Sequence, residues 1–270
     1  MQTMHRRPIP STGELLPVIG CGTWQAFDVR DGAPLVPVLE ELFAAGGSLV
    51  DSSPMYGRAE AVAGALLGRM ESLDRAFVAT KVWTSGRDAG IAQMERSMAL
   101  LGKTDLMQVH NLLDWRTHFE TLRRWKDEGR VRYLGVTHYT PTAHDALEAA
   151  MRAEAMDFVQ LDYALDDRAA ERRLLPLAAD KGIAVIVNRP FGGGGLARRV
   201  RGRAVPDFAA ELGCDTWPQL LLKFILGHPA VTCAIPATAN AVHMADNARA
   251  GCGPLPDEAM RARIAASFAS

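Results

Sequence analysis

Short apolar runs recur along this chain at intervals of about thirty residues, separated by stretches with helical periodicity. Eight of these runs are rich in Val, Ile, Leu and Phe and alternate little with polar residues. Such a pattern is typical of parallel strands buried on both faces. The predicted strands cover residues 18–22, 48–51, 76–81, 106–110, 133–137, 158–161, 184–187 and 232–235.

Amphipathic patterns between the apolar runs predict helices, and most of them stop at glycine, the usual C-terminal signal. A further helix is expected to begin at Pro141, with Thr140 as its N-cap. The other predicted helices cover residues 35–45, 89–101, 119–128, 174–181 and 256–269.

Eight strand-then-helix units within about 250 residues match the size of a (β/α)8 TIM barrel. A doubly wound open sheet is the alternative, but no GxGxxG motif follows the first predicted strand. Residues 7–18 are interpreted as a hairpin that turns at Ser11-Thr12-Gly13 and closes the bottom of the barrel. Because no repeat or linker interrupts the chain, residues 1–270 are expected to form one α/β domain.

Composition narrows the class of protein. The 270 residues are 48% hydrophobic and carry a formal charge of -1, which argues against nucleic acid or a membrane surface as a partner. The 4 cysteines show no CxxC spacing, so neither a disulfide framework nor a metal site is expected. No apolar region follows Arg6-Arg7, and no run is long enough to span a membrane. A cytoplasmic protein is therefore expected.

Three charged or titratable residues stand at the ends of consecutive predicted strands: Asp51, Lys81 and His110. Active sites of such barrels lie at this end of the strands. Each residue alone is as compatible with a structural role, as a strand-end cap or in an ion pair, as with a functional one. A buried charge costs several kcal/mol unless it is paired, so three in register indicate a polar cluster.

Tyr56 lies five residues beyond Asp51, in a loop shaped by Pro54 and Gly57. A half-buried loop aromatic is the ordinary interpretation. Beside a lysine, however, the pKa of a phenol is lowered, because the cation favours phenolate. This places a candidate proton donor near the cluster.

These residues together resemble the aldo-keto reductase family. The resemblance rests on Gly20-Cys21-Gly22-Thr23-Trp24, on Asp51-x4-Tyr56, and on Lys81 and His110 at the next two strand ends. Segments 135–138, 159–163, 235–238 and 246–247 fall where the family has its cofactor segments. The match extends from about Ile9 to Ala250.

The resemblance implies reduction of an aldehyde or ketone by a nicotinamide cofactor, without a metal. Tyr56 would be the general acid, Lys81 would lower its pKa, Asp51 would hold Lys81, and His110 would orient the carbonyl oxygen. NADPH is the family default, and NADH is not excluded because Ala237 and His243 stand where many members have Lys and Arg. The partner would be a small-molecule carbonyl compound, with the oligomeric state undetermined.

The resemblance also implies a cofactor site. Tyr163 would stack on the nicotinamide ring, Thr137, His138 and Gln160 would contact its carboxamide, and the glycine run after the seventh strand would approach the pyrophosphate. Arg198, Arg199, Arg201 and Arg203, which follow the glycine run, are equally interpreted as a solvated basic face or as phosphate contacts. The implied cofactor residues are Thr23, Thr137, His138, Gln160, Tyr163, Arg189, Pro190, Phe191, Gly192, Gly193, Gly194, Leu196, Arg198, Thr238 and Asn247.

Substrate contacts are assigned to Trp24, Met55 and Trp83, apolar residues just beyond strand ends that are equally compatible with packing between loops. Two other functions stay open. A cofactor-binding relative with weak or no catalysis could act through protein contacts, although such a protein has no need of the charged cluster. A barrel lyase or isomerase could use Lys81 as a Schiff base, but Asp51 should keep that amine charged.

Overall fold

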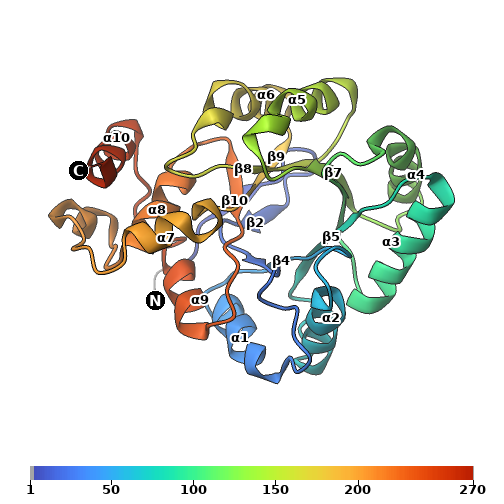
Figure 1. Cartoon of the computed structure of the whole chain (residues 1–270), viewed down its shortest axis with the longest axis horizontal. Helices are drawn as coiled ribbons and strands as arrows, with labels where there is room; N and C mark the ends of the chain where they lie inside the picture. The colour runs from blue at the N-terminus through green and yellow to red at the C-terminus, as the bar shows by residue number, and fades with distance from the viewer. Residues whose placement is uncertain (1–2, 270) are drawn as a thin grey trace.

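The computed structural model describes residues 3–269, which form a barrel of eight parallel strands surrounded by helices (Figure 1). The strands pair in sequence order, and parallel bridges from Ile19 to Ala234 and from Gly22 to Ala237 join the last strand to the first. The strands are β3 (Cys21–Gly22), β4 (Leu49–Asp51), β5 (Phe77–Val82), β6 (Leu106–His110), β7 (Tyr133–Thr137), β8 (Phe158–Asp162), β9 (Ala184–Asn188) and β10 (Val231–Ala234). The predicted (β/α)8 fold is confirmed.

All the helices that the sequence pattern predicts are found, and the structure has four more within residues 3–269. Helix α6 has the predicted bounds, and α5 begins three residues later than expected because Pro141 first starts a short 3-10 turn. The helices are α1 (Val36–Ala44), α2 (Ala59–Arg69), α3 (Arg87–Leu101), α4 (Trp115–Asp127), α5 (His144–Ala153), α6 (Leu174–Lys181), α7 (Gly195–Arg199), α8 (Trp217–Leu226), α9 (Ala241–Arg249) and α10 (Glu258–Ala269).

The N-terminal hairpin closes the bottom of the barrel, as predicted. Strands β1 (Arg6–Pro8) and β2 (Leu15–Pro17) pair antiparallel. Ile9 and Leu16 are buried among the residues that begin β4 to β9. The hydroxyl groups of Thr12 and Tyr133 are 2.9 Å apart, which ties the turn of the hairpin to the start of β7.

The opposite end of the barrel carries the polar cluster of Asp51, Lys81 and His110. The loops at that end surround a large cavity. A long connection after β9, residues 191–205, forms one wall of that cavity, and we call it the strap. It contains α7 and is fixed in the core by Leu196 and Val200. Within residues 3–269, no helix is long and apolar enough to cross a membrane.

Candidate active site

Asp51 and Lys81 form a buried ion pair at the C-terminal ends of β4 and β5. Nζ of Lys81 donates to Oδ2 of Asp51 at 2.7 Å and to the backbone oxygen of Ser52 at 2.6 Å. Burial by itself lowers the pKa of Lys81, but Asp51 and Tyr56 favour the charged amine, and the pKa lies above its ordinary value. Lys81 is therefore a permanent cation, which argues against the Schiff-base function.

The ring of Tyr56 lies beside both Lys81 and His110. Nζ of Lys81 lies 5.0 Å from the centre of the Tyr56 ring, and the ring of His110 packs edge-on against Tyr56 with centroids 5.6 Å apart. The expected lowering of the Tyr56 pKa is not found. Burial raises this pKa by more than the charge of Lys81 lowers it, and the charge of Asp51 raises it further. The phenol therefore stays protonated at neutral pH.

His110 ends β6 and is a neutral imidazole. Its Nδ1 lies 2.8 Å from Oγ of Ser53, whereas Nε2 has no hydrogen-bond partner within residues 3–269. Burial lowers the pKa of His110 to about 2, with the charges of Lys81 and His138 contributing. A neutral ring with one nitrogen facing the cavity can hydrogen-bond a ligand oxygen without carrying charge.

The loop after His110 holds three non-glycine residues in the left-handed conformation. Asn111, Leu112 and Asp114 have φ of 53°, 56° and 50°, an arrangement that costs of order 1 kcal/mol or more per residue. Oδ2 of Asp114 accepts from the backbone N–H of Gly86 at 2.7 Å, which ties this loop to the one after β5. Nothing in the sequence pattern predicts this conformation of the loop.

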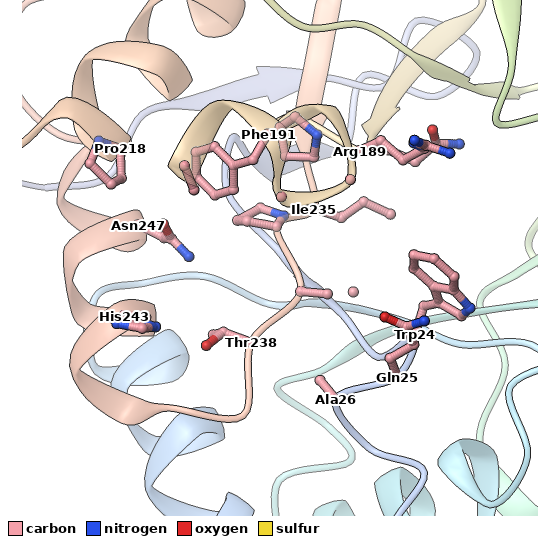
Figure 2. A pocket seen from close by; sticks show the side chains of 18 of the residues that line it. Trp24, Gln25, Ala26, Arg189, Phe191, Pro218, Ile235, Thr238, His243 and Asn247 are labelled. Carbon is pink, nitrogen blue, oxygen red and sulfur yellow. The ribbon is translucent and has the colours of Figure 1, made fainter. Parts of the chain in front are cut away.

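The cluster opens onto a cavity of about 970 Å³ at the C-terminal end of the barrel (Figure 2). Its walls bring together residues from β3, β4, β6, β7, β8, β9, α8 and α9, from the segment that follows β10, and from the strap. The predicted site residues that line it are Thr23, Trp24, Asp51, Met55, Tyr56, His110, Thr137, Gln160, Arg189, Pro190, Phe191, Gly193, Gly194, Thr238 and Asn247.

Other predicted residues lie off this cavity. Tyr163 is buried against Phe224, and its hydroxyl bonds to Glu171 and Arg261, so it does not line the proposed nicotinamide site. The side chain of Tyr163 is held away from the cavity because its hydroxyl bonds to the ion pair of Arg261 and Glu171. Trp83, Gly192, Leu196 and Arg198 also do not line the cavity.

The side chains expected to contact the nicotinamide carboxamide form hydrogen bonds within the protein. Gln160 donates from Nε2 to Oδ1 of Asp51 at 2.9 Å and accepts from Thr137 at 3.0 Å. His138 does not line the cavity, because its Nδ1 accepts from the backbone N–H of Tyr139 at 3.0 Å and its ring stacks on Tyr139.

The glycine run after β9 adopts a left-handed backbone conformation. Gly192, Gly193 and Gly194 have φ of 57°, 65° and 89°, a conformation that favours glycine, and the last two line the cavity. Beyond them, Arg201 and Arg203 line the cavity. Arg198 is exposed and does not line it, although its Nη1 would lie 3.3 Å from a Cβ on Gly194. The sequence offers both arginines as possible phosphate contacts, whereas Asn188, Tyr139 and Trp217 were not assigned to the site.

The sequence is similar to those of known aldo/keto reductases. A sequence model of the Aldo/keto reductase family matches residues 18–266. An aldo-keto reductase of Mycobacterium sp. (strain KMS) is 29% identical over 197 residues, which cover 68% of this chain and 67% of that protein. The NADH-specific methylglyoxal reductase of Escherichia coli (strain K12) is 24% identical over 246 residues, covering 76% of this chain and 73% of the reductase.

Solved structures share the fold. The aldo/keto reductase of Klebsiella pneumoniae in complex with NADP and acetate superposes with a TM-score of 0.82 at 24% identity, covering 99% of this chain and 96% of that chain. Together with the family match over residues 18–266, these findings show that the chain belongs to the aldo/keto reductase family.

Proposed function

We propose that this chain is an NAD(P)H-dependent oxidoreductase that reduces an aldehyde or ketone to an alcohol, with Tyr56 as the general acid. The observation that carries the proposal is the buried pair of Lys81 and Asp51, at 2.7 Å, next to a phenol that opens onto a large cavity. Since the family comprises NAD(P)H-dependent oxidoreductases, its match over residues 18–266 supports this assignment.

The cavity suits a dinucleotide. Its volume of about 970 Å³ lies at the upper end of the range for ligand sites. Gly193 and Gly194 present backbone without a Cβ at positive φ, which allows close approach of a pyrophosphate. Thr238 and Asn247 line one end and would contact the adenosine portion, and Thr137 and Phe191 would hold the nicotinamide half. When bound, the cofactor supplies hydride to the carbonyl carbon.

Proton transfer to the carbonyl oxygen is assigned to Tyr56. Its raised pKa keeps the phenol protonated and ready to donate at neutral pH. As the proton leaves, the phenolate that remains is stabilised by the cation of Lys81, which Asp51 holds in place. The neutral ring of His110 would hydrogen-bond the same oxygen and orient it. Such acid catalysis contributes about 10²–10⁴-fold to the rate.

The cofactor preference is proposed to be NADPH. Arg201 lines the cavity from the strap, and none of the ion pairs found within residues 3–269 includes its guanidinium. This cation would contact a cofactor phosphate in place of the lysine that many family members have at the position of Ala237. The solved Klebsiella relative holds NADP, whereas the Escherichia relative is NADH-specific, so the two cofactors need direct comparison.

The test combines binding and turnover. Purified protein is titrated with NADPH and NADH by fluorescence, and a panel of aldehydes and ketones is assayed by loss of NADPH absorbance. The proposal predicts binding and turnover of at least one carbonyl class. Binding without turnover on a broad panel would favour a non-catalytic relative that acts through protein contacts. Failure to bind either nucleotide would contradict both functions.

A further inference from the structure

Arg189 is held in an unusual position on the cavity wall. It follows directly after β9 and has φ of 48°, which is rare for a residue other than glycine. Its guanidinium carbon lies 5.6 Å from the centre of the Tyr139 ring. On the other side, a Cβ on Gly193 would come within 2.8 Å of Nη2 of Arg189, so the glycine makes room for the guanidinium.

The positive charge of Arg189 has no acidic partner in the part of the chain that the structure describes. None of the ion pairs found within residues 3–269 includes it. Arg203 of the same cavity donates to backbone oxygens, whereas Arg201 is in no ion pair either. Three acids line the cavity. Asp51 is bound to Lys81, Asp215 to Arg249, and Asp246 accepts from Thr216 and Gln219. An anion from outside the protein is therefore the natural partner of Arg189.

The direction of the side chain separates this anion from the adenosine end of the cavity. Figure 2 shows Arg189 extending toward the side that carries Trp24, whereas Thr238, His243 and Asn247 lie at the opposite side. Trp24 and Tyr139 are large exposed apolar residues of the same rim. Arg189 is therefore a cation beside aromatic walls, at the end where a substrate would enter.

We propose that Arg189 binds a carboxylate on the substrate in place of the cofactor contact that the family resemblance implies, so that the site selects carbonyl compounds that carry an acidic group. This inference rests on the proposed carbonyl reduction. A guanidinium binds a carboxylate through two parallel hydrogen bonds, which fixes both position and orientation. The apolar body of such a substrate would lie against Trp24 and Tyr139, with its carbonyl oxygen at Tyr56 and His110. Arg189 acts in recognition and does not touch the reacting atoms.

A matched pair of substrates tests the proposal. 4-Carboxybenzaldehyde and its methyl ester have the same aldehyde and ring and differ in charge. For the wild-type protein we expect a higher kcat/KM for the acid. In Arg189→Gln the acid should lose about 10- to 100-fold in kcat/KM, the scale of a charge-assisted hydrogen bond, through KM. The ester should change less than about twofold by the same reasoning, and Arg189→Lys should recover part of the loss.

Two controls separate the proposal from its alternatives. If Arg189 instead contacts a cofactor phosphate, Arg189→Gln weakens NADPH binding and slows acid and ester equally, which overturns the proposal. Arg201→Gln, on the strap, is the matched variant that should weaken NADPH binding without discriminating between acid and ester. Melting curves of both variants show whether they are folded.

A binding readout keeps the test independent of turnover. With NADP⁺ bound, the aldehydes are not reduced, and their affinity is read from tryptophan fluorescence. Weaker binding of the acid, but not of the ester, in Arg189→Gln supports the proposal even if no turnover is found. Equal affinity of both proteins for the acid overturns it. Absence of turnover in the wild type with this selective binding intact would contradict the proposed reduction alone.

Discussion

Nε2 of Gln160 donates to Oδ1 of Asp51 over 2.9 Å, so a side chain at β8 is bonded to one at the end of β4 across the mouth of the barrel. Gln160 also accepts a hydrogen bond from Thr137 at 3.0 Å. The family resemblance assigns Gln160 to the nicotinamide carboxamide. In the structure its hydrogen bonds also make it a support of the ion pair between Asp51 and Lys81.

Replacing Gln160 with Leu distinguishes these two roles. The variant leaves Oδ1 of Asp51 with only the long bond from Gln108 at 3.4 Å. We expect the free energy of unfolding to fall by about 1–3 kcal/mol, the cost of an unsatisfied buried group. The Kd of NADPH should change little. Urea unfolding and a fluorescence titration measure the two quantities, and a large rise in Kd without loss of stability would restore the carboxamide role.

The neutral state of His110 predicts how stability depends on pH. The pKa of His110 is lowered from 6.5 to about 2 by burial and by the charges of Lys81 and His138. Between these values the unfolded chain binds a proton that the folded protein does not. Stability should therefore fall as the pH falls below 6.5, by up to about 1.4 kcal/mol per pH unit from this group.

The variant His110→Gln isolates this contribution. Urea unfolding of both proteins at a series of pH values below neutral should give a shallower slope for the variant. His138 and His228, whose pKa values are also lowered by burial, contribute to both proteins and cancel in the comparison. Identical slopes would show that His110 is protonated in the folded protein.

Two glycines of α2 predict opposite effects on stability. A Cβ on Gly64 would lie 1.9 Å from the backbone oxygen of Leu100 in α3, whereas one on Gly68 would meet nothing within 4 Å. Gly64→Ala should therefore lower the free energy of unfolding by about 1–3 kcal/mol through overpacking. Gly68→Ala should raise it by about 0.5–1 kcal/mol, because alanine is the better helix former. Equal effects in urea unfolding would contradict the packing of α2 against α3.

The sequence was most informative where local pattern decides the structure. An apolar run fixes where a strand ends, and in a parallel barrel all such ends lie on one side, so Asp51, Lys81 and His110 could be brought together before any coordinates. The same logic located the hairpin, because its turn residues stand outside the alternating pattern. Helix α8 was not predicted, although nearly all of its residues are buried.

Side-chain direction beyond a strand end depends on tertiary partners that spacing does not reveal. Tyr163 turns toward Glu171 and Arg261, which lie far along the chain. His138 turns to the backbone of Tyr139. The pKa of Tyr56 likewise depends on a balance between burial and two opposite charges, and pairing the phenol with Lys81 alone gave the wrong direction.

The most direct test of the central claim is the rate of hydride transfer in Tyr56→Phe, measured in a single turnover with bound NADPH and a carbonyl compound that the wild type reduces. The variant keeps the ring that packs against His110 and removes the hydroxyl group that would donate the proton. We predict a rate at least about 10²-fold lower, with the Kd of NADPH within about twofold of the wild type. Hydride transfer at the wild-type rate would show that another group protonates the carbonyl oxygen.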